Sequence, residues 1–286
     1  MRMWSVTTSE LMRFAARRLP RGLTIGVVVV AIAAVVTAVA QGTEIRYPDA
    51  LEGSFLGAGQ LLVYVGAALG ASAIAAEWNT GSLATLLLFD PSRVRVLVAK
   101  MLAAAIGSAA VVVVVFVAIA GVLAVGAAVS GTFERDSGVV VTVPSDEADL
   151  QIADEPQGTA ELLEVDEEAP FARNAVIYTG RVMGAAALAA VFGVAVGALV
   201  RRTAAVIGGL LILAMFGELA IGELLRFDTF WGPARSLVAV AVGPIEFAGF
   251  QNLQGPYLAY AFAWTAGAVV LALVWFSRTE VATGPR

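Results

Sequence analysis

The chain has 286 residues, of which 59% are hydrophobic and 14% are charged, and its mean hydropathy is +0.85. Soluble domains carry about 25% charged residues, so this composition predicts an integral membrane protein. Because the sequence contains no Cys and no His, disulfides, thiolate metal sites and histidine-based catalysis are excluded. The net charge of -5 conceals separate cationic and acidic regions.

Residues 1–21 predict an amphipathic helix that lies along the cytoplasmic face of the membrane. Apolar residues, among them Trp4, alternate there with charged ones such as Arg13 and Arg17. In such a helix Trp4 lies at headgroup depth and the arginines contact anionic lipid. The same residues also fit an ordinary positively charged flank of the first span.

Six stretches are apolar over a length that can span a membrane, since a helix needs about 20 residues to cross about 30 Å of hydrocarbon. The first of them ends on Ala38-Val39-Ala40, which is typical of a cleaved signal peptide, but its long basic start favours an uncleaved span. The six stretches are residues 23–40, 55–76, 101–129, 176–200, 203–221 and 257–277. Three pairs of glycines at four-residue spacing favour close helix packing within them: Gly66 and Gly70, Gly180 and Gly184, and Gly193 and Gly197.

A seventh apolar stretch, residues 237–250, is short and is interrupted by Gly243-Pro244. We therefore expect a re-entrant or interfacial segment there, within an outer region that covers residues 222–256. The predicted fold class is an all-α integral membrane protein with six transmembrane helices. Three of them fall within residues 22–129 and three within residues 176–277.

The positions of the cations predict the orientation of these spans. Twelve of the 18 Lys and Arg residues fall on one side of the six-span arrangement, and the positive-inside rule assigns that side to the cytoplasm. Both termini, with a tail at 278–286, are then cytoplasmic. The Arg-rich composition suggests a bacterial genome and therefore a bacterial cell membrane. The twelve cations are Arg2, Arg13, Arg17, Arg18, Arg21, Arg93, Arg95, Lys100, Arg201, Arg202, Arg278 and Arg286.

Residues 130–175 predict a small acidic loop outside the cell. The loop contains twelve Asp and Glu residues against Arg135 and Arg173. Two short runs of β-forming residues, at 139–143 and 150–152, are compatible with a β-hairpin. A solvated acidic face is favoured over a calcium site, because the loop lacks the ligand spacing that calcium requires.

The sequence offers little chemistry of its own. It has no phosphate-binding loop for a nucleotide and no pair of aspartates within the spans, so we expect no enzymatic activity, no metal and no cofactor in this chain. Within the spans only Glu218 is a good candidate for a buried charge, and Arg181 lies near the outer edge of the preceding span. These two residues can pair, or Arg181 can extend to the interface alone.

Residues 77–100 predict a docking segment between the second and third spans. Asn79-Thr80-Gly81 ends the second span, Ser82 caps a short helix at 83–89, and Pro91 begins the next helix. Arg93 and Lys100 then lead into the third span. A short apolar helix with flanking charges on the cytoplasmic side favours docking of another protein.

This segment resembles the permease subunits of ABC-2-type transporters. The resemblance implies a coupling helix at 82–89 that fits a groove in a separate ATPase, with the N-terminal helix beside it. It also implies that the ATPase binds ATP and Mg²⁺, that a second permease chain, identical or related, completes the pathway, and that no nucleic acid is involved. The motif residues are Glu77, Gly81, Ser82, Leu83, Leu86, Leu87, Pro91, Arg93 and Lys100.

The acidic loop is longer than most members of that family carry, so the substrate, whether lipid-like, drug-like or a peptide, is left open. Export is favoured because nothing in the sequence suggests docking of a periplasmic binding protein. The alternative is a membrane-bound sensor or assembly factor that uses the acidic outer loop and transports nothing.

Overall fold

The computed structural model describes residues 3–16, 18–40, 47–89, 92–130, 171–225, 231–242 and 256–278, and within these ranges it is helical without strands. The predicted acidic loop, apart from its two edges, falls outside the described residues, as do Arg17, Pro91 and the C-terminal tail. The elements are α1 (Met3–Ala16), α2 (Arg18–Ala40), α3 (Tyr47–Thr80), α4 (Ser82–Phe89), α5 (Arg93–Ser130), α6 (Phe171–Val200), α7 (Thr203–Ile212), η1 (Leu213–Gly217), α8 (Glu218–Leu225), α9 (Pro233–Val242) and α10 (Pro256–Arg278).

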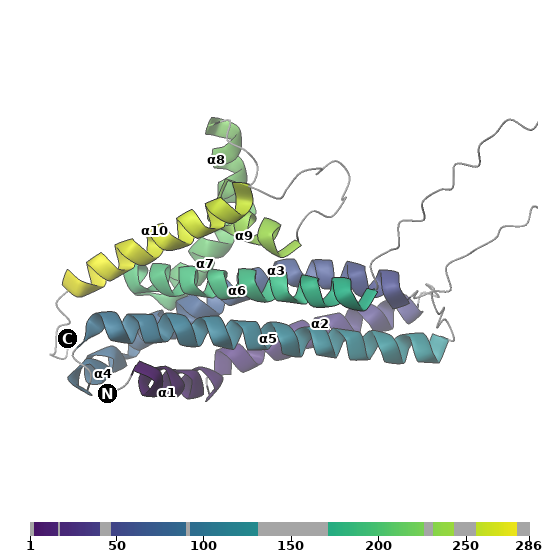
Figure 1. The fold of residues 1–286 in the computed structure, drawn as a ribbon, viewed down its shortest axis with the longest axis horizontal. Helices are drawn as coiled ribbons and strands as arrows, with labels where there is room; N and C mark the ends of the chain where they lie inside the picture. Colours follow the sequence, from purple (N-terminus) through teal and green to yellow (C-terminus); the bar gives the residue numbers. More distant parts are fainter. Residues whose placement is uncertain are drawn as a thin grey trace, which may run out of the picture.

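Helices α2, α3, α5 and α6 run along the long axis of the molecule, and α10 crosses them at a slant (Figure 1). The described part of the chain contains four helices that are long and apolar enough to cross a membrane. They are Gly57–Thr80, Arg93–Gly126, Ala175–Val200 and Pro256–Arg278. The sequence-based prediction of a helical membrane protein is thereby confirmed for the second, third, fourth and sixth predicted stretches.

The two remaining predicted stretches are also helical. Helix α2 covers residues 23–40, and the stretch 203–221 is divided among α7, the π-helix η1 and α8. The hydrogen bonds of a π-helix span five residues, one more than those of an α-helix, and such helices are rare. Helix α9 has ten residues, or about 15 Å at 1.5 Å per residue, which is half of what a span requires.

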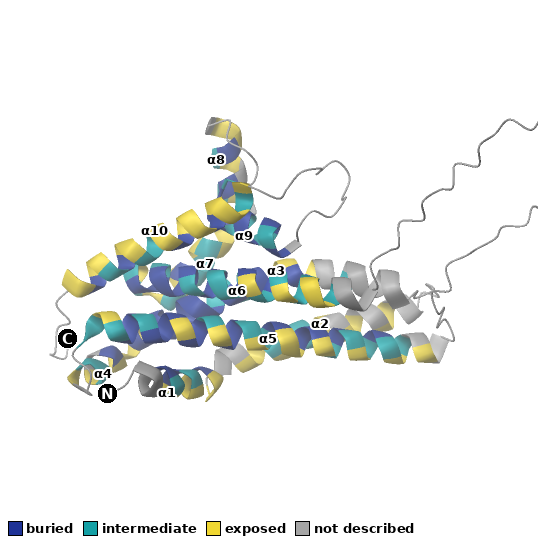
Figure 2. Ribbon diagram, viewed as in Figure 1, coloured by how far each residue is buried: buried dark blue, intermediate teal, exposed yellow. Residues whose placement is uncertain are grey.

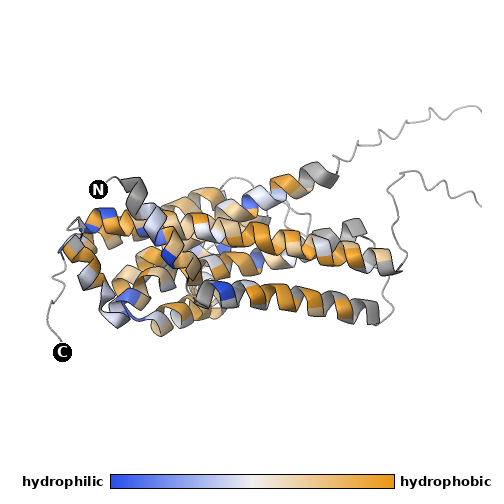
Figure 3. Ribbon diagram, turned by 90° about the horizontal axis from the view of Figure 1, so that it is seen from below, coloured by the Kyte–Doolittle hydropathy of each residue, from blue (hydrophilic) through white to orange (hydrophobic). Residues whose placement is uncertain are grey.

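The outward faces of the long helices are apolar. Exposed residues follow α10 and α5 along their length (Figure 2). Hydrophobic residues predominate over most of the helical ribbon (Figure 3). On α10, Phe262, Val270 and Leu271 are each more than half exposed. Such a surface would be unfavourable in water but suits contact with lipid.

Aromatic residues mark both ends of α10. Tyr257, Tyr260 and Trp264 lie near its start, where the indole Nε1 of Trp264 donates a hydrogen bond of 2.7 Å to the backbone oxygen of Trp231. Trp275 lies near the other end. Tyr257 and Trp275 are separated by about 27 Å along the helix, which agrees with an aromatic belt at each face of a bilayer about 30 Å thick.

The central contact of the bundle, between α3 and α6, depends on small residues. A Cβ added at Gly66 would come within 2.6 Å of the backbone oxygen of Ala186, and one at Gly197 within 2.8 Å of that of Ala71. Gly70 and Gly193 lie even closer to the facing backbone. The predicted packing role is confirmed for these two pairs. Gly180 and Gly184, however, have no neighbour within 4 Å of an added Cβ.

Candidate docking site at one end of the bundle

The candidate site lies at the end of the bundle that holds α1, α4 and the last turn of α10 (Figure 1), where α3 also ends. Helix α3 ends at Thr80, and Gly81 follows with φ of 70°. This left-handed conformation is open to glycine without strain, so the chain reverses there and begins α4 at Ser82. The predicted turn and short helix are thereby confirmed.

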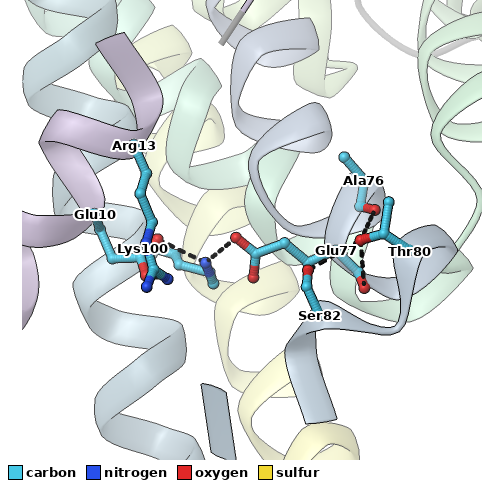
Figure 4. A network of polar contacts seen from close by, with 7 residues as sticks. All are labelled: Glu10, Arg13, Ala76, Glu77, Thr80, Ser82 and Lys100. Carbon is cyan, nitrogen blue, oxygen red and sulfur yellow. Dashed lines mark hydrogen bonds and ion pairs between the residues drawn. The ribbon is translucent and has the colours of Figure 1, made fainter. Parts of the chain in front are cut away.

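A buried lysine holds three helices together beneath this turn. The ammonium of Lys100, on α5, is 2.7 Å from Oε2 of Glu10 on α1 and 2.7 Å from Oε1 of Glu77 on α3. Figure 4 shows Lys100 between the two carboxylates. Lys100 is 1% exposed, so its charge is almost fully removed from water.

The charges of this group balance. Arg13 on α1 is the fourth member of the group. Its half-exposed side chain lies 3.2 Å from Oε1 of Glu10. Two carboxylates therefore meet two cations, and the network is formally neutral. Neutrality matters because an uncompensated buried charge is strongly destabilising, whereas a hydrogen-bonded pair is tolerated. The network fixes the positions of α1, α3 and α5 relative to one another.

Helix α1 is packed against the bundle by an apolar contact as well. Phe14 is buried in the same cluster as Leu83 of α4 and Phe276 of α10. Its ring fills the space that a side chain at Gly107 of α5 would need. The predicted amphipathic helix thus has one face on α5, while Met12 on its other face is 68% exposed. The side chain of Trp4 and residue Arg17 lie outside what the structure describes.

The leucines of α4 divide into two groups. Leu83 is 1% exposed and anchors the helix in the core, and Leu86 and Leu87 are partly buried against the same cluster. Leu88 is 76% exposed. Of the predicted docking leucines, Leu83 is therefore an internal anchor, and among the α4 side chains that the structure describes, the apolar one that projects outward is Leu88.

A groove of about 630 Å³ lies between α1, the end of α3 and α4. Its walls combine apolar atoms with hydroxyl groups, one carboxylate and one guanidinium, a composition suited to an amphipathic partner. Thr80 and Ser82 link two of the walls through a 2.9 Å contact between their hydroxyl oxygens (Figure 4). The lining residues are Arg13, Ala16, Ala76, Glu77, Thr80, Ser82, Thr85 and Leu86.

Arg93 and Arg95 lie on the first turn of α5, because this helix begins at Arg93, ahead of the apolar stretch 101–129. Lys100 is consequently a helical residue in the third turn, on the face that is directed at α1 and α3. The amide of Val96 donates to the backbone oxygen of Ser92 at 3.1 Å, which begins the helix.

The sequence left open whether Arg181 and Glu218 pair with each other, and in the described residues each has a different partner. Glu218 is 1% exposed, and its two oxygens accept the backbone N–H groups of Ala234 at 2.7 Å and Arg235 at 2.9 Å. Arg181 instead donates through Nε to the backbone oxygen of Val240 at 3.3 Å. The carboxylate is thus drawn to the N-terminus of α9, whose free N–H groups attract an anion.

Sequence reasoning missed three residues of this site. Glu10 looks like any charge on an amphipathic helix until α1 is packed against α5. Leu88 and Thr85 stand out by exposure, which the leucine-rich pattern alone does not distinguish from the buried positions. The one local signal in the sequence was the spacing of Glu10 and Arg13, which are three residues apart and can therefore pair on one face of a helix.

Comparison of the chain with models of known protein families and with curated proteins finds no match.

Proposed function

We propose that this chain is the permease subunit of an ATP-driven exporter and that a separate ATPase docks on residues 77–100. The observation that carries the proposal is the formally neutral network of Glu10, Arg13, Lys100 and Glu77 close to the start of helix α4. A displacement of the short helix α4 can move the bundle only if the helices next to α4 are rigidly connected to one another. Buried, mutually satisfied ion pairs supply such a connection.

The groove beside α4 supports docking of an amphipathic element of the partner. Leu88 projects outward, Thr85 is exposed, and Arg13 lies on the opposite wall. A central apolar anchor surrounded by polar groups is the usual anatomy of a protein interface. The partner ATPase would bind ATP and Mg²⁺, and this chain would contribute neither catalysis nor cofactor.

The proposed topology has six spans, with α2 and the helical stretch 203–225 added to the four long apolar helices. Helices α1 and α4 and the last turn of α10 lie at one end of the bundle (Figure 1), which agrees with an even number of crossings and with cytoplasmic termini. The route for the substrate would run between this chain and a second permease chain. Lipid would cover the remaining apolar surface.

The test is purification of the tagged chain from its native host, with Leu88→Asp as the variant and Leu88→Met as its matched control. Leu88 is preferred over Leu86 and Leu87 because those residues also pack within the chain. We expect an ATPase to co-purify with the unaltered chain and with Leu88→Met but to be lost with Leu88→Asp. An ATPase that remains bound to Leu88→Asp at the same yield contradicts docking on α4.

The sensor or assembly-factor alternative makes a different prediction about the acidic loop. In an exporter, removal of residues 134–168 with a short Gly/Ser bridge leaves transport in place and changes its dependence on salt, since twelve carboxylates act through a screened field. In a sensor, the same deletion removes the activity, and no ATPase accompanies the intact chain.

A further inference from the structure

The turn between α6 and α7 contains a residue with an unfavourable backbone. Arg201 has φ of 61°, and it is the one non-glycine residue with positive φ in the part of the chain that the structure describes. This conformation is costly for a residue that carries a Cβ, whereas glycine adopts it freely. Strain of this kind persists where the surroundings require it. We therefore expect contacts of the Arg201 side chain to offset the cost of its backbone conformation.

The side chain of Arg201 lies between two helices that are far apart in the sequence. Its guanidinium carbon is 4.5 Å from the ring centre of Trp78 on α3 and 6.0 Å from that of Trp275 on α10. Both distances are in the range of cation–π attraction. The ring of Trp78 also meets Phe276 of α10 edge-on, with centres 6.0 Å apart. One cation thus ties the turn to both neighbours.

The last residues of α3 distribute their contacts around the whole end of the bundle. Glu77 pairs with α5 through Lys100, and Trp78 holds Arg201 of the α6–α7 turn. Asn79 donates through Nδ2 to Oγ1 of Thr203, the first residue of α7, at 3.0 Å. Thr80 contacts Ser82 of α4. Four consecutive residues cover just over one helical turn, so their side chains point in all directions.

We propose that Arg201 is a positioning residue that makes the α6–α7 turn follow the end of α3, so that displacement of α4 is passed to α7 and α10. The tie itself follows from the geometry, and its use in coupling rests on the proposed function. The turn has two residues, Arg201 and Arg202, which leaves little slack between α6 and α7. Helix α7 also packs against α3, and Asn79 bonds to Thr203, so loss of the cation would loosen the turn and widen the range of positions of α7 without detaching it.

The first experiment tests whether Arg201 holds the α6–α7 turn against α3, and it does not depend on transport. Because the chain has no cysteine, spin labels can be attached at Thr85→Cys on α4 and Ala205→Cys on α7, both exposed positions. Pulsed dipolar spectroscopy then gives the distribution of distances between the labels. We expect a narrow distribution for the otherwise unaltered chain and a broader one for Arg201→Asn, since Asn tolerates positive φ but offers no cation.

The matched control is Arg202→Asn. Arg202 has extended backbone, with φ of -122°, and the substitution removes the same charge from the neighbouring position. We expect its distance distribution to equal that of the unaltered chain. A second variant, Trp78→Leu, removes the ring and should broaden the distribution as Arg201→Asn does. Unchanged distances in Arg201→Asn, or equal broadening in the Arg202→Asn control, would overturn the proposal.

The second experiment addresses coupling in proteoliposomes that contain the ATPase. We expect Arg201→Asn to keep the ATPase bound and ATP hydrolysis active but to lower the transport per ATP by about fivefold, which corresponds to the loss of about 1 kcal/mol of cation–π attraction. An unaltered ratio would overturn the coupling role. If no ATPase accompanies the unaltered chain, the proposed function fails, while the distance experiment still decides whether Arg201 ties α7 to α3.

Discussion

At the scale of single residues, the chain holds its buried charges in two different ways. Lys100 is paired with side chains from two other helices, Glu10 and Glu77. Glu218 has backbone partners instead, the first N–H groups of α9. The first arrangement links distant segments, and the second links consecutive ones. Both satisfy a charge that would otherwise be expensive to bury.

Substitution of Lys100 by Met should destabilise the protein by about 3–5 kcal/mol, because the buried Glu77 would lose this cation and Glu10 would keep only the half-exposed Arg13. The triple variant Glu10→Gln, Glu77→Gln, Lys100→Met should be closer to the unaltered chain, since no charge is then stranded. Thermal unfolding of the purified protein in detergent measures both. A triple variant less stable than the single one would contradict an ion-pair origin of the effect.

Glu218 can be tested without being replaced. A Cβ at Gly232 would overlap its carboxylate, so Gly232→Ala should displace the carboxylate from the N–H groups of Ala234 and Arg235. We expect faster hydrogen exchange in α9 and a loss of about 0.5–2 kcal/mol, as for other helix N-caps. The matched control is Gly208→Ala, where nothing lies within 4 Å. Equal exchange in the two variants would argue against capping by Glu218.

At the scale of elements, the packing of α3 on α6 sets the stability of the bundle. An alanine at Gly70 or Gly193 would place its Cβ against the backbone of the facing helix. Backbone cannot move aside as a flexible side chain can, so either substitution should cost about 1–3 kcal/mol. Gly184→Ala on α6 should instead be neutral or stabilising by about 0.5–1 kcal/mol, because it has open space and gains helix propensity.

Unfolding temperatures of Gly70→Ala, Gly193→Ala and Gly184→Ala in the same detergent give this comparison directly. The expected order places Gly184→Ala above the two interface variants. If Gly184→Ala is as unstable as Gly70→Ala, then close approach of α3 and α6 is not what the glycines provide.

The periodic features of the helices could be predicted from the sequence, and the long-range contacts could not. Apolar length identified the four long spans, and Gly81 and Ser82 identified the turn before α4. Glu77 and Lys100 were selected by the resemblance to a transporter family, but Glu10 joins them only because α1 packs on α5. The positive φ of Arg201 could not be predicted from the sequence, because positive φ is usually signalled by Gly or Asn. The sequence left open whether Glu218 pairs with Arg181, and it did not indicate the backbone partners of Glu218, because α9 begins at Pro233, four residues before the apolar run.

At the scale of the whole molecule, the proposed topology has one decisive measurement. Single cysteines at Ser92 and Ser145 introduce unique thiols into a chain that has none. The cation distribution predicts that an impermeant maleimide added to intact cells labels Ser145→Cys and spares Ser92→Cys until the membrane is opened. The reverse pattern would contradict the orientation and remove the cytoplasmic assignment of α4.

Lys100 also gives the molecule a built-in chemical reporter. It is the only lysine among the 286 residues, and in the folded chain it is 1% exposed. An amine-reactive reagent therefore has a single side-chain target, and that target is shielded as long as α1, α3 and α5 stay together. Acylation at this position, read by mass spectrometry, would count the fraction of molecules in which the helix ends have separated, with no engineered label at all.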